Sequence, residues 1–162
     1  MRYFTVLLLI SISAWSYSAL ASEQPTVAGE RPFGLTLNYG GPTLLGSASA
    51  NLFVLPTVRT EIGVGYIGYF LGAACHPFGQ KIESQSPYLG AYYSRFKIPI
   101  PFLDERMELL YVPVGTSKCW RDGFTINLEL AYMRDLVESR NLFFAGVKVG
   151  YYFKTKHTKK NN

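Results

Sequence analysis

The sequence contains few of the residues on which catalysis and metal binding depend. Its 162 residues include two histidines, His76 and His157, and two cysteines, Cys75 and Cys119. These four residues stand at unrelated spacings, so they do not form a set of metal ligands. Nucleophilic hydrolysis needs a serine or similar group beside a base, and no serine shares a strand face with His76. The sequence therefore predicts no catalytic residue, no metal site and no cofactor, and it favours a structural role for His76.

Two cysteines leave one intramolecular pairing open. In an exported protein a disulfide between Cys75 and Cys119 is permitted. It would contribute roughly 4 kcal/mol in the chain-entropy model, if the geometry allows it to form. The alternative is a pair of separate thiols, and the residues alone do not decide between the two.

Charged residues are also scarce, at 17% of the sequence, and residues 32–58 and 62–80 carry none. Uncharged stretches of this length raise the alternative of membrane-spanning helices. Their glycines, serines and Gly-Gly-Pro turn suit a helix badly, and their polarity alternates with a period of two. Tyrosine, phenylalanine and glycine are abundant. Such a chain either has a very large core for its size or exposes apolar side chains to something other than water.

The N-terminal residues 1–21 have the pattern of a secretory signal peptide. Arg2 precedes an apolar stretch from Phe4 to Trp15, and a small-x-small site before Ser22 predicts cleavage between Ala21 and Ser22. The apolar stretch is shorter than the roughly 20 residues of a membrane-spanning helix, which disfavours the alternative of a retained anchor.

After cleavage the chain is long enough for one domain. We expect a polar linker at residues 22–31, a β-domain at residues 32–153 and a solvated basic tail at residues 154–162, which carries four lysines. The other basic residues are scattered along an exported chain, which argues against a nucleic-acid partner.

The β-domain divides into segments that alternate in polarity and are separated by glycine, proline and polar turns. No segment has a sustained helical period. Eight segments are expected to be strands: residues 33–40, 44–54, 58–66, 69–78, 87–96, 106–115, 124–132 and 143–153. The fourth alternates poorly, and the sixth has mixed faces and a proline, Pro113. The pattern predicts an all-β meander with mostly short connections.

The two faces of these segments differ in a way that a soluble barrel does not share. One face is apolar and carries large aromatic residues near the strand ends, which is typical of the two interfaces of a membrane. The other face consists of glycine, serine, threonine and asparagine with a few isolated charges. Seven aromatic residues are expected to face lipid: Phe33, Tyr39, Tyr66, Phe124, Tyr132, Tyr151 and Phe153. The sequence therefore favours an eight-stranded antiparallel up-and-down transmembrane β-barrel with a small polar lumen.

The signal peptide, the alternating segments and a last strand that ends in aromatics resemble the small outer-membrane β-barrel proteins of Gram-negative bacteria. The stretch GVKVGYYF, ending at Phe153, is similar to the assembly signal at the end of such chains, although nine residues follow it here. The resemblance implies residence in the outer membrane, with the lipid bilayer and the barrel-assembly machinery as partners.

The isolated charges are expected to point into the lumen. If residues 134–141 form a hairpin loop, Glu129 lies opposite position 146, and Lys148 is its diagonal neighbour. Arg59 and Glu61 form a second couple on one strand. Buried charges must be paired, so the sequence predicts an internal ion network. A proton or ion path is the alternative, which the narrow lumen of eight strands disfavours.

These features predict an outer-membrane barrel with a plugged lumen, no enzymatic activity, and a structural, envelope or surface-interaction role. Two alternatives remain open: a secreted soluble β-barrel that binds an apolar ligand inside, and an envelope enzyme that modifies lipid.

Overall fold

The computed structural model describes residues 25–97, 106–138 and 140–155. The predicted signal peptide with its cleavage site between Ala21 and Ser22, the proline-containing connection at residues 98–105 and most of the basic tail, residues 156–162, lie outside the described residues.

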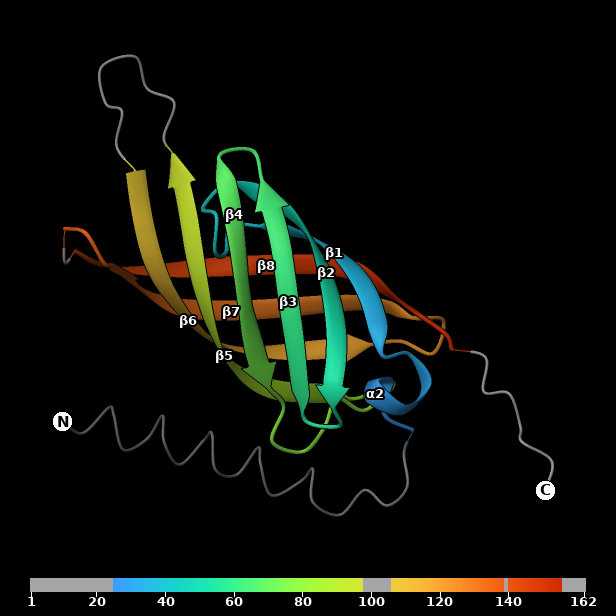
Figure 1. Ribbon diagram of the computed structural model, residues 1–162. Helices are drawn as coiled ribbons and strands as arrows, with labels where there is room; N and C mark the ends of the chain where they lie inside the picture. Colours follow the sequence, from blue (N-terminus) through green and yellow to red (C-terminus); the bar gives the residue numbers. More distant parts are fainter. Residues whose placement is uncertain (1–24, 98–105, 139, 156–162) are drawn as a thin grey trace, which may run out of the picture.

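The chain forms a closed barrel of eight antiparallel strands (Figure 1). Each strand pairs with the next along the chain, and the last pairs with the first. The strands are β1 (Phe33–Tyr39), β2 (Gly46–Leu55), β3 (Val58–Gly65), β4 (Gly68–Cys75), β5 (Gln85–Lys97), β6 (Arg106–Cys119), β7 (Phe124–Asp135) and β8 (Asn141–Phe153). The predicted fold class is therefore confirmed. No helix within the described ranges is long and apolar enough to span a membrane.

The register of the last hairpin and of the closing strand pair agrees with the sequence pattern. Glu129 on β7 lies opposite Gly146 on β8, as the expected hairpin loop requires. β8 closes against β1 with Phe153 opposite Phe33. Because every strand has two neighbours, every strand can exchange backbone hydrogen bonds on both sides and the sheet has no open edge.

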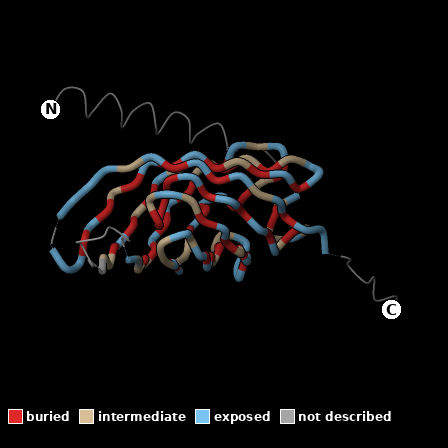
Figure 2. The backbone as a smooth tube through the Cα atoms, turned by 90° about the horizontal axis from the view of Figure 1, so that it is seen from above, coloured by how far each residue is buried: buried red, intermediate tan, exposed pale blue. Residues whose placement is uncertain are grey.

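Buried and exposed residues alternate along most of the strands (Figure 2). In β7, for example, the apolar side chains Leu128 and Leu130 are exposed, whereas Asn127 and Glu129 are buried. This alternation follows from the pleat of a β-strand, in which successive side chains point to opposite faces.

β6 is longer than expected and contains Pro113 in its middle. Its ladder with β5 pairs Leu89 with Val114 and resumes at the pairing of Tyr92 with Tyr111, so the break coincides with Pro113, which has no N–H to donate. The mixed polarity of this segment arises because two bulky side chains, Leu109 and Tyr111, face the interior.

The segment expected to be a polar linker contains structure. Helix α2 (Val27–Glu30) begins after Thr26, whose side-chain oxygen accepts a hydrogen bond from the Gly29 N–H. Val27 donates its backbone N–H to the Gln80 carbonyl and packs in a buried cluster at this end of the barrel. The other members of the cluster are Phe53, Ile82, Cys119 and Tyr152. The polar composition of the segment indicated a linker, but Val27 and backbone hydrogen bonds to the connection between β4 and β5 dock it on the barrel.

Arg31 ties this helix to the last strand. Its Nη1 donates to the Tyr152 carbonyl at 2.9 Å, and its Nη2 donates to the Arg121 carbonyl at 2.8 Å. The Thr155 N–H donates in turn to the Glu30 carbonyl. Residues 25–31, together with the connection between β4 and β5, therefore cover one mouth of the barrel, which we call the α2 end.

The turn between β1 and β2 covers the opposite end. Gly40 and Gly41 have φ angles of 73° and 82°, a left-handed conformation that glycine adopts readily. This conformation directs the turn inward, so that Thr43 is buried and Leu44 packs against buried side chains inside the barrel, among them Phe70 and Tyr111.

Glycines on the inner face make room for aromatic rings. A Cβ on Gly34 would lie 2.6 Å from the Tyr152 ring, and a Cβ on Gly63 would overlap the Phe70 ring. The narrow interior of an eight-stranded barrel can hold such rings only where the facing residue has no side chain.

We expect Gly63→Ala to lower the free energy of unfolding by about 1–3 kcal/mol, because the added methyl group overpacks the interior against Phe70. The double variant Gly63→Ala/Phe70→Leu should lose less than the sum of the two single variants. Urea unfolding in detergent micelles measures these values. Gly46→Ala is the matched control and should change little, because the nearest atom would lie 3.8 Å from the added methyl carbon. Strict additivity of the two substitutions would contradict the packing argument.

Candidate functional site

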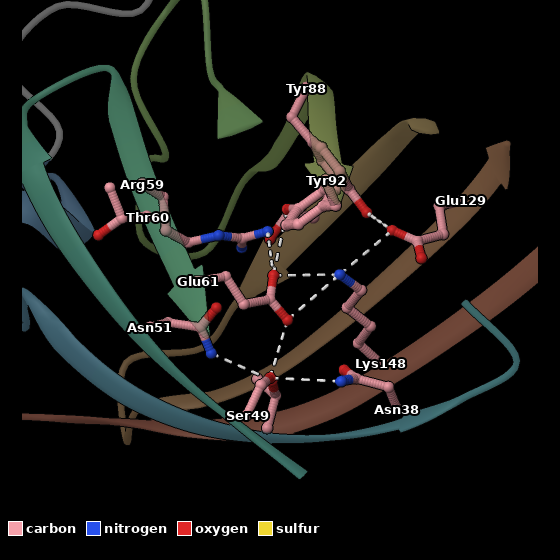
Figure 3. Close-up of polar contacts among 12 residues, drawn as sticks. Asn38, Ser49, Asn51, Arg59, Thr60, Glu61, Tyr88, Tyr92, Glu129 and Lys148 are labelled. Atoms are coloured by element: carbon pink, nitrogen blue, oxygen red, sulfur yellow. Dashed lines mark hydrogen bonds and ion pairs between the residues drawn. The ribbon is translucent and has the colours of Figure 1, made fainter. Parts of the chain in front are cut away.

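The four charged residues expected in the lumen are all buried inside the barrel, and the structure brings them together (Figure 3). Lys148 Nζ lies 3.1 Å from Glu61 Oε2 and 3.6 Å from Glu129 Oε2. Arg59 Nη2 lies 3.8 Å from the same Glu61 oxygen. Two cations and two carboxylates thus form one electrically balanced cluster, with Lys148 at its centre.

The strand register explains this position of Lys148. On β8 it lies opposite Asn38 of β1 and opposite Asn127 of β7, so small polar neighbours flank it on both sides. Glu61 belongs to β3, which is not a neighbour of β8. The contact between Lys148 and Glu61 therefore crosses the interior and exists only because the sheet closes.

Two hydroxyl groups also donate hydrogen bonds to Glu129. The phenol groups of Tyr88 and Tyr111 each donate a hydrogen bond of 2.6 Å, one to each carboxylate oxygen. Hydrogen bonds to a charged acceptor are stronger than neutral ones, which helps to offset the cost of burying the carboxylate.

Glu61 is held in a similar way from the other side of the interior. Ser49 Oγ donates to it at 2.8 Å and Tyr92 OH at 3.1 Å. The Lys148 ammonium also lies 4.7 Å from the centre of the Tyr92 ring. Tyr92 therefore stabilises both members of the ion pair.

The three tyrosines were not among the residues predicted for this cluster. The alternation of residues 87–96 assigns Tyr92 to the same face as Gly90 and Ser94, so the inward direction of Tyr92, and by extension of Tyr88, was available from the pattern. Tyr111 was hidden by the mixed faces around Pro113.

His76 is buried directly after β4, at the α2 end and outside the strands. Its ring lies 5.7 Å from that of Phe53 and 5.4 Å from that of Tyr88. Burial, and to a lesser degree the positive charge of Arg59, lowers the pKa of His76 to about 2. The imidazole is therefore neutral at physiological pH and is a poor general base.

The cysteines are free thiols, so the disulfide that the sequence left open is not formed. Cys75 is exposed on the outer wall, whereas Cys119 is buried in the cluster around Val27. The side chains lie on opposite faces of the sheet, and a bond between them would have to pass through it. The described residues also contain no group of three or more histidine, cysteine, aspartate or glutamate side chains that could hold a metal ion.

All seven aromatic residues that were expected to face lipid lie on the outer wall, and they occur at its two ends. Phe33 stacks on Phe153 at 5.7 Å at the α2 end, where Phe124 lies opposite Tyr151. Tyr39, Tyr66 and Tyr132 lie at the other end, with the Tyr132 ring 5.7 Å from that of Phe143.

The wall between these two aromatic zones is almost wholly apolar. A shallow groove of about 750 Å³ crosses it above β2, where alanines replace larger side chains. Leucine, isoleucine and valine side chains from β1 and β3 border the groove: Leu35, Leu37, Ile62 and Val64.

We expect Lys148→Met to lower the free energy of unfolding by about 3–5 kcal/mol, because it leaves buried carboxylates uncompensated. Lys148→Glu should prevent folding. The double variant Lys148→Met/Glu129→Gln removes one charge of each sign and should recover part of the loss. Urea unfolding and heat-dependent gel migration measure the effect. Arg140→Met is the control, because the Arg140 side chain is 70% exposed in its pair with Glu138 and should contribute at most about 1 kcal/mol. Equal losses at positions 140 and 148 would contradict a central role for Lys148.

His76 should make the barrel less stable in acid. Unfolded His76 binds a proton near pH 6.5, whereas the folded residue binds one only near pH 2. Between these values the unfolded state binds more protons, so the free energy of unfolding decreases as the pH falls, by roughly 2 kcal/mol between about pH 7.5 and pH 5. His76→Phe should remove this part of the pH dependence, which urea titrations at a series of pH values will detect. Parallel pH profiles for the two proteins would contradict the assignment.

Comparison with known proteins identifies the fold but no family. No family model and no curated protein matches the sequence. Among solved structures, the N-terminal β-barrel domain of Pseudomonas aeruginosa OprF is similar, with a TM-score of 0.57 and 18% sequence identity. The similarity covers 76% of this chain and 99% of that domain. The expected resemblance to small outer-membrane β-barrels is thereby shown at the level of the fold.

Proposed function

We propose that this protein is an integral outer-membrane β-barrel with a plugged interior, which has a structural, envelope or surface-interaction role and performs no catalysis. Its main partner in this proposal is the lipid bilayer, and the barrel-assembly machinery inserts it. The overall similarity to the OprF barrel domain supports the class of protein, and the properties of the chain itself support the more specific statements.

The observation that carries the proposal is the inverted polarity of the barrel. Leu37, Val64 and Leu130 are 68%, 64% and 71% exposed on the outer wall, while the charged cluster around Lys148 is buried. In water this arrangement would expose a continuous apolar surface and bury charges at high cost. In a bilayer the same wall contacts acyl chains, and the aromatic zones lie at the two interfaces.

The plugged interior is supported by the contents of the barrel and by its two ends. The ion network and its tyrosines occupy the interior, residues 25–31 cover the α2 end, and the turn at residues 40–45 covers the other. Eight strands enclose little more space than side chains fill. We therefore expect no stable ion-conducting channel in planar bilayers.

The same features disfavour the two alternatives. A soluble barrel that binds an apolar ligand would need an apolar interior, and here the interior carries the ion network. An enzyme acting on lipid would need an accessible base, and His76 is buried with a strongly lowered pKa.

A pair of leucine substitutions tests membrane residence directly. Leu130→Arg places a charge in the middle of the apolar wall and should cost about 2–4 kcal/mol of folding free energy in phospholipid vesicles. Leu136→Arg, in the turn after β7, is the matched control and should have little effect. In a water-soluble barrel both exposed leucines would tolerate arginine equally well. Equal tolerance, or a folded monomer in water without detergent, would overturn the proposal.

A further inference from the structure

The aromatic residues at the α2 end form a continuous arc around one side of the barrel. Trp120 packs against Phe124 with ring centres 5.4 Å apart, and Phe124 lies opposite Tyr151 in the strand register. Tyr151 contacts Phe153 at 5.3 Å, and Phe153 stacks on Phe33. We call these five residues, which extend from the turn after β6 to β1, the aromatic arc.

Lysine residues stand at both edges of the aromatic arc. Lys118 lies on β6, with its Nζ 5.1 Å from the centre of the Trp120 ring. Lys154 is exposed and directly follows Phe153, and three more lysines occur after it in the sequence. A lysine beside an interfacial aromatic ring can extend its ammonium group to the level of lipid headgroups while its methylene chain stays on apolar surface.

The acidic side chains near the aromatic arc accept hydrogen bonds from backbone N–H groups. Glu83 Oε1 accepts the Arg121 N–H at 2.8 Å, and Asp122 Oδ1 accepts the Phe124 N–H at 3.0 Å. Within the described part of the chain, no ion pair involves Lys118 or Lys154. The positive charge of these lysines is therefore directed to the surroundings of the barrel.

The opposite end of the barrel differs in this respect. There Arg95 pairs with Glu108 at 3.6 Å, and Arg140 pairs with Glu138 at 2.7 Å. Two basic side chains are thus paired with acidic ones at that end, whereas Lys118 and Lys154 beside the aromatic arc have no ion pair among the described residues.

We propose that the aromatic arc, with Lys118 and Lys154 at its edges, binds the phosphate groups of anionic phospholipids in the leaflet at the α2 end. This inference rests on the proposed membrane residence of the barrel. The rings fix the depth of the site at the interface, and the lysines select lipids whose phosphate charge is not balanced by a headgroup cation. A basic residue near an anionic lipid surface strengthens binding about fivefold.

Trp120 provides a reporter inside the site. In the full chain, Trp15→Phe leaves Trp120 as the only tryptophan. Brominated lipids quench tryptophan fluorescence on contact, so vesicles containing brominated phosphatidylglycerol or brominated phosphatidylcholine at equal mole fraction report which lipid lies beside Trp120. We expect an apparent preference for phosphatidylglycerol of about fivefold or more, which decreases as salt screens the charges.

The matched variants are Lys118→Gln/Lys154→Gln at the arc and Arg134→Gln/Arg140→Gln at the opposite end. The first pair should abolish the preference, and the second should leave it unchanged, with each protein normalised to its fluorescence in unbrominated lipid.

Equal quenching by both brominated lipids, or a preference that survives the loss of both lysines, would overturn the inference while membrane residence still holds. Loss of the preference on adding inorganic phosphate at constant ionic strength would overturn the assignment to lipid. Absence of quenching by either lipid would instead contradict the proposed membrane residence itself.

Discussion

The rest of the interior depends on one ammonium group held between two carboxylates. Lys148 contacts Glu61 and Glu129 from the centre of the barrel, where each charge would be costly without its partner. The surrounding residues support its carboxylates: tyrosine hydroxyls donate to Glu129, and Ser49 and Tyr92 donate to Glu61. Glycines opposite the large rings provide the space that they need. The interior is therefore specified by polar contacts with directional geometry, which distinguishes it from a core packed only with apolar groups.

The apolar outer wall is the counterpart of this polar interior. Because polar side chains face the interior, the alternate positions of the strands carry mostly apolar side chains on the outer wall. Aromatic residues at both ends mark the limits of that wall. The two ends are chemically different. At one end acidic and basic side chains form ion pairs with one another. At the α2 end two acidic side chains accept hydrogen bonds from backbone N–H groups, and two lysines flank the aromatic arc.

The mouths of the barrel are covered by segments with little regular structure. At the α2 end a single apolar side chain, Val27, and the guanidinium group of Arg31 fasten residues 25–31 to the strands. At the other end the left-handed conformation of Gly40 and Gly41 directs a turn inward. The α2 end is therefore held by contacts between segments far apart in the sequence, whereas the other end depends on the local conformation of two glycines.

The sequence alone determined the strands, their order and the inward direction of Glu129 and Lys148. These features are local, because the pleat of a strand alternates its side chains and a short loop sets the register of its hairpin. Only the tertiary structure decided that Lys148 contacts Glu61 across the interior and that Tyr111 joins this cluster. It also decided that Cys75 and Cys119 lie on opposite faces of the sheet, and that residues 25–31 pack against the barrel instead of forming a free linker. Each of these depends on segments distant in sequence, which become neighbours only when the sheet closes, and no pattern within one segment carries that information.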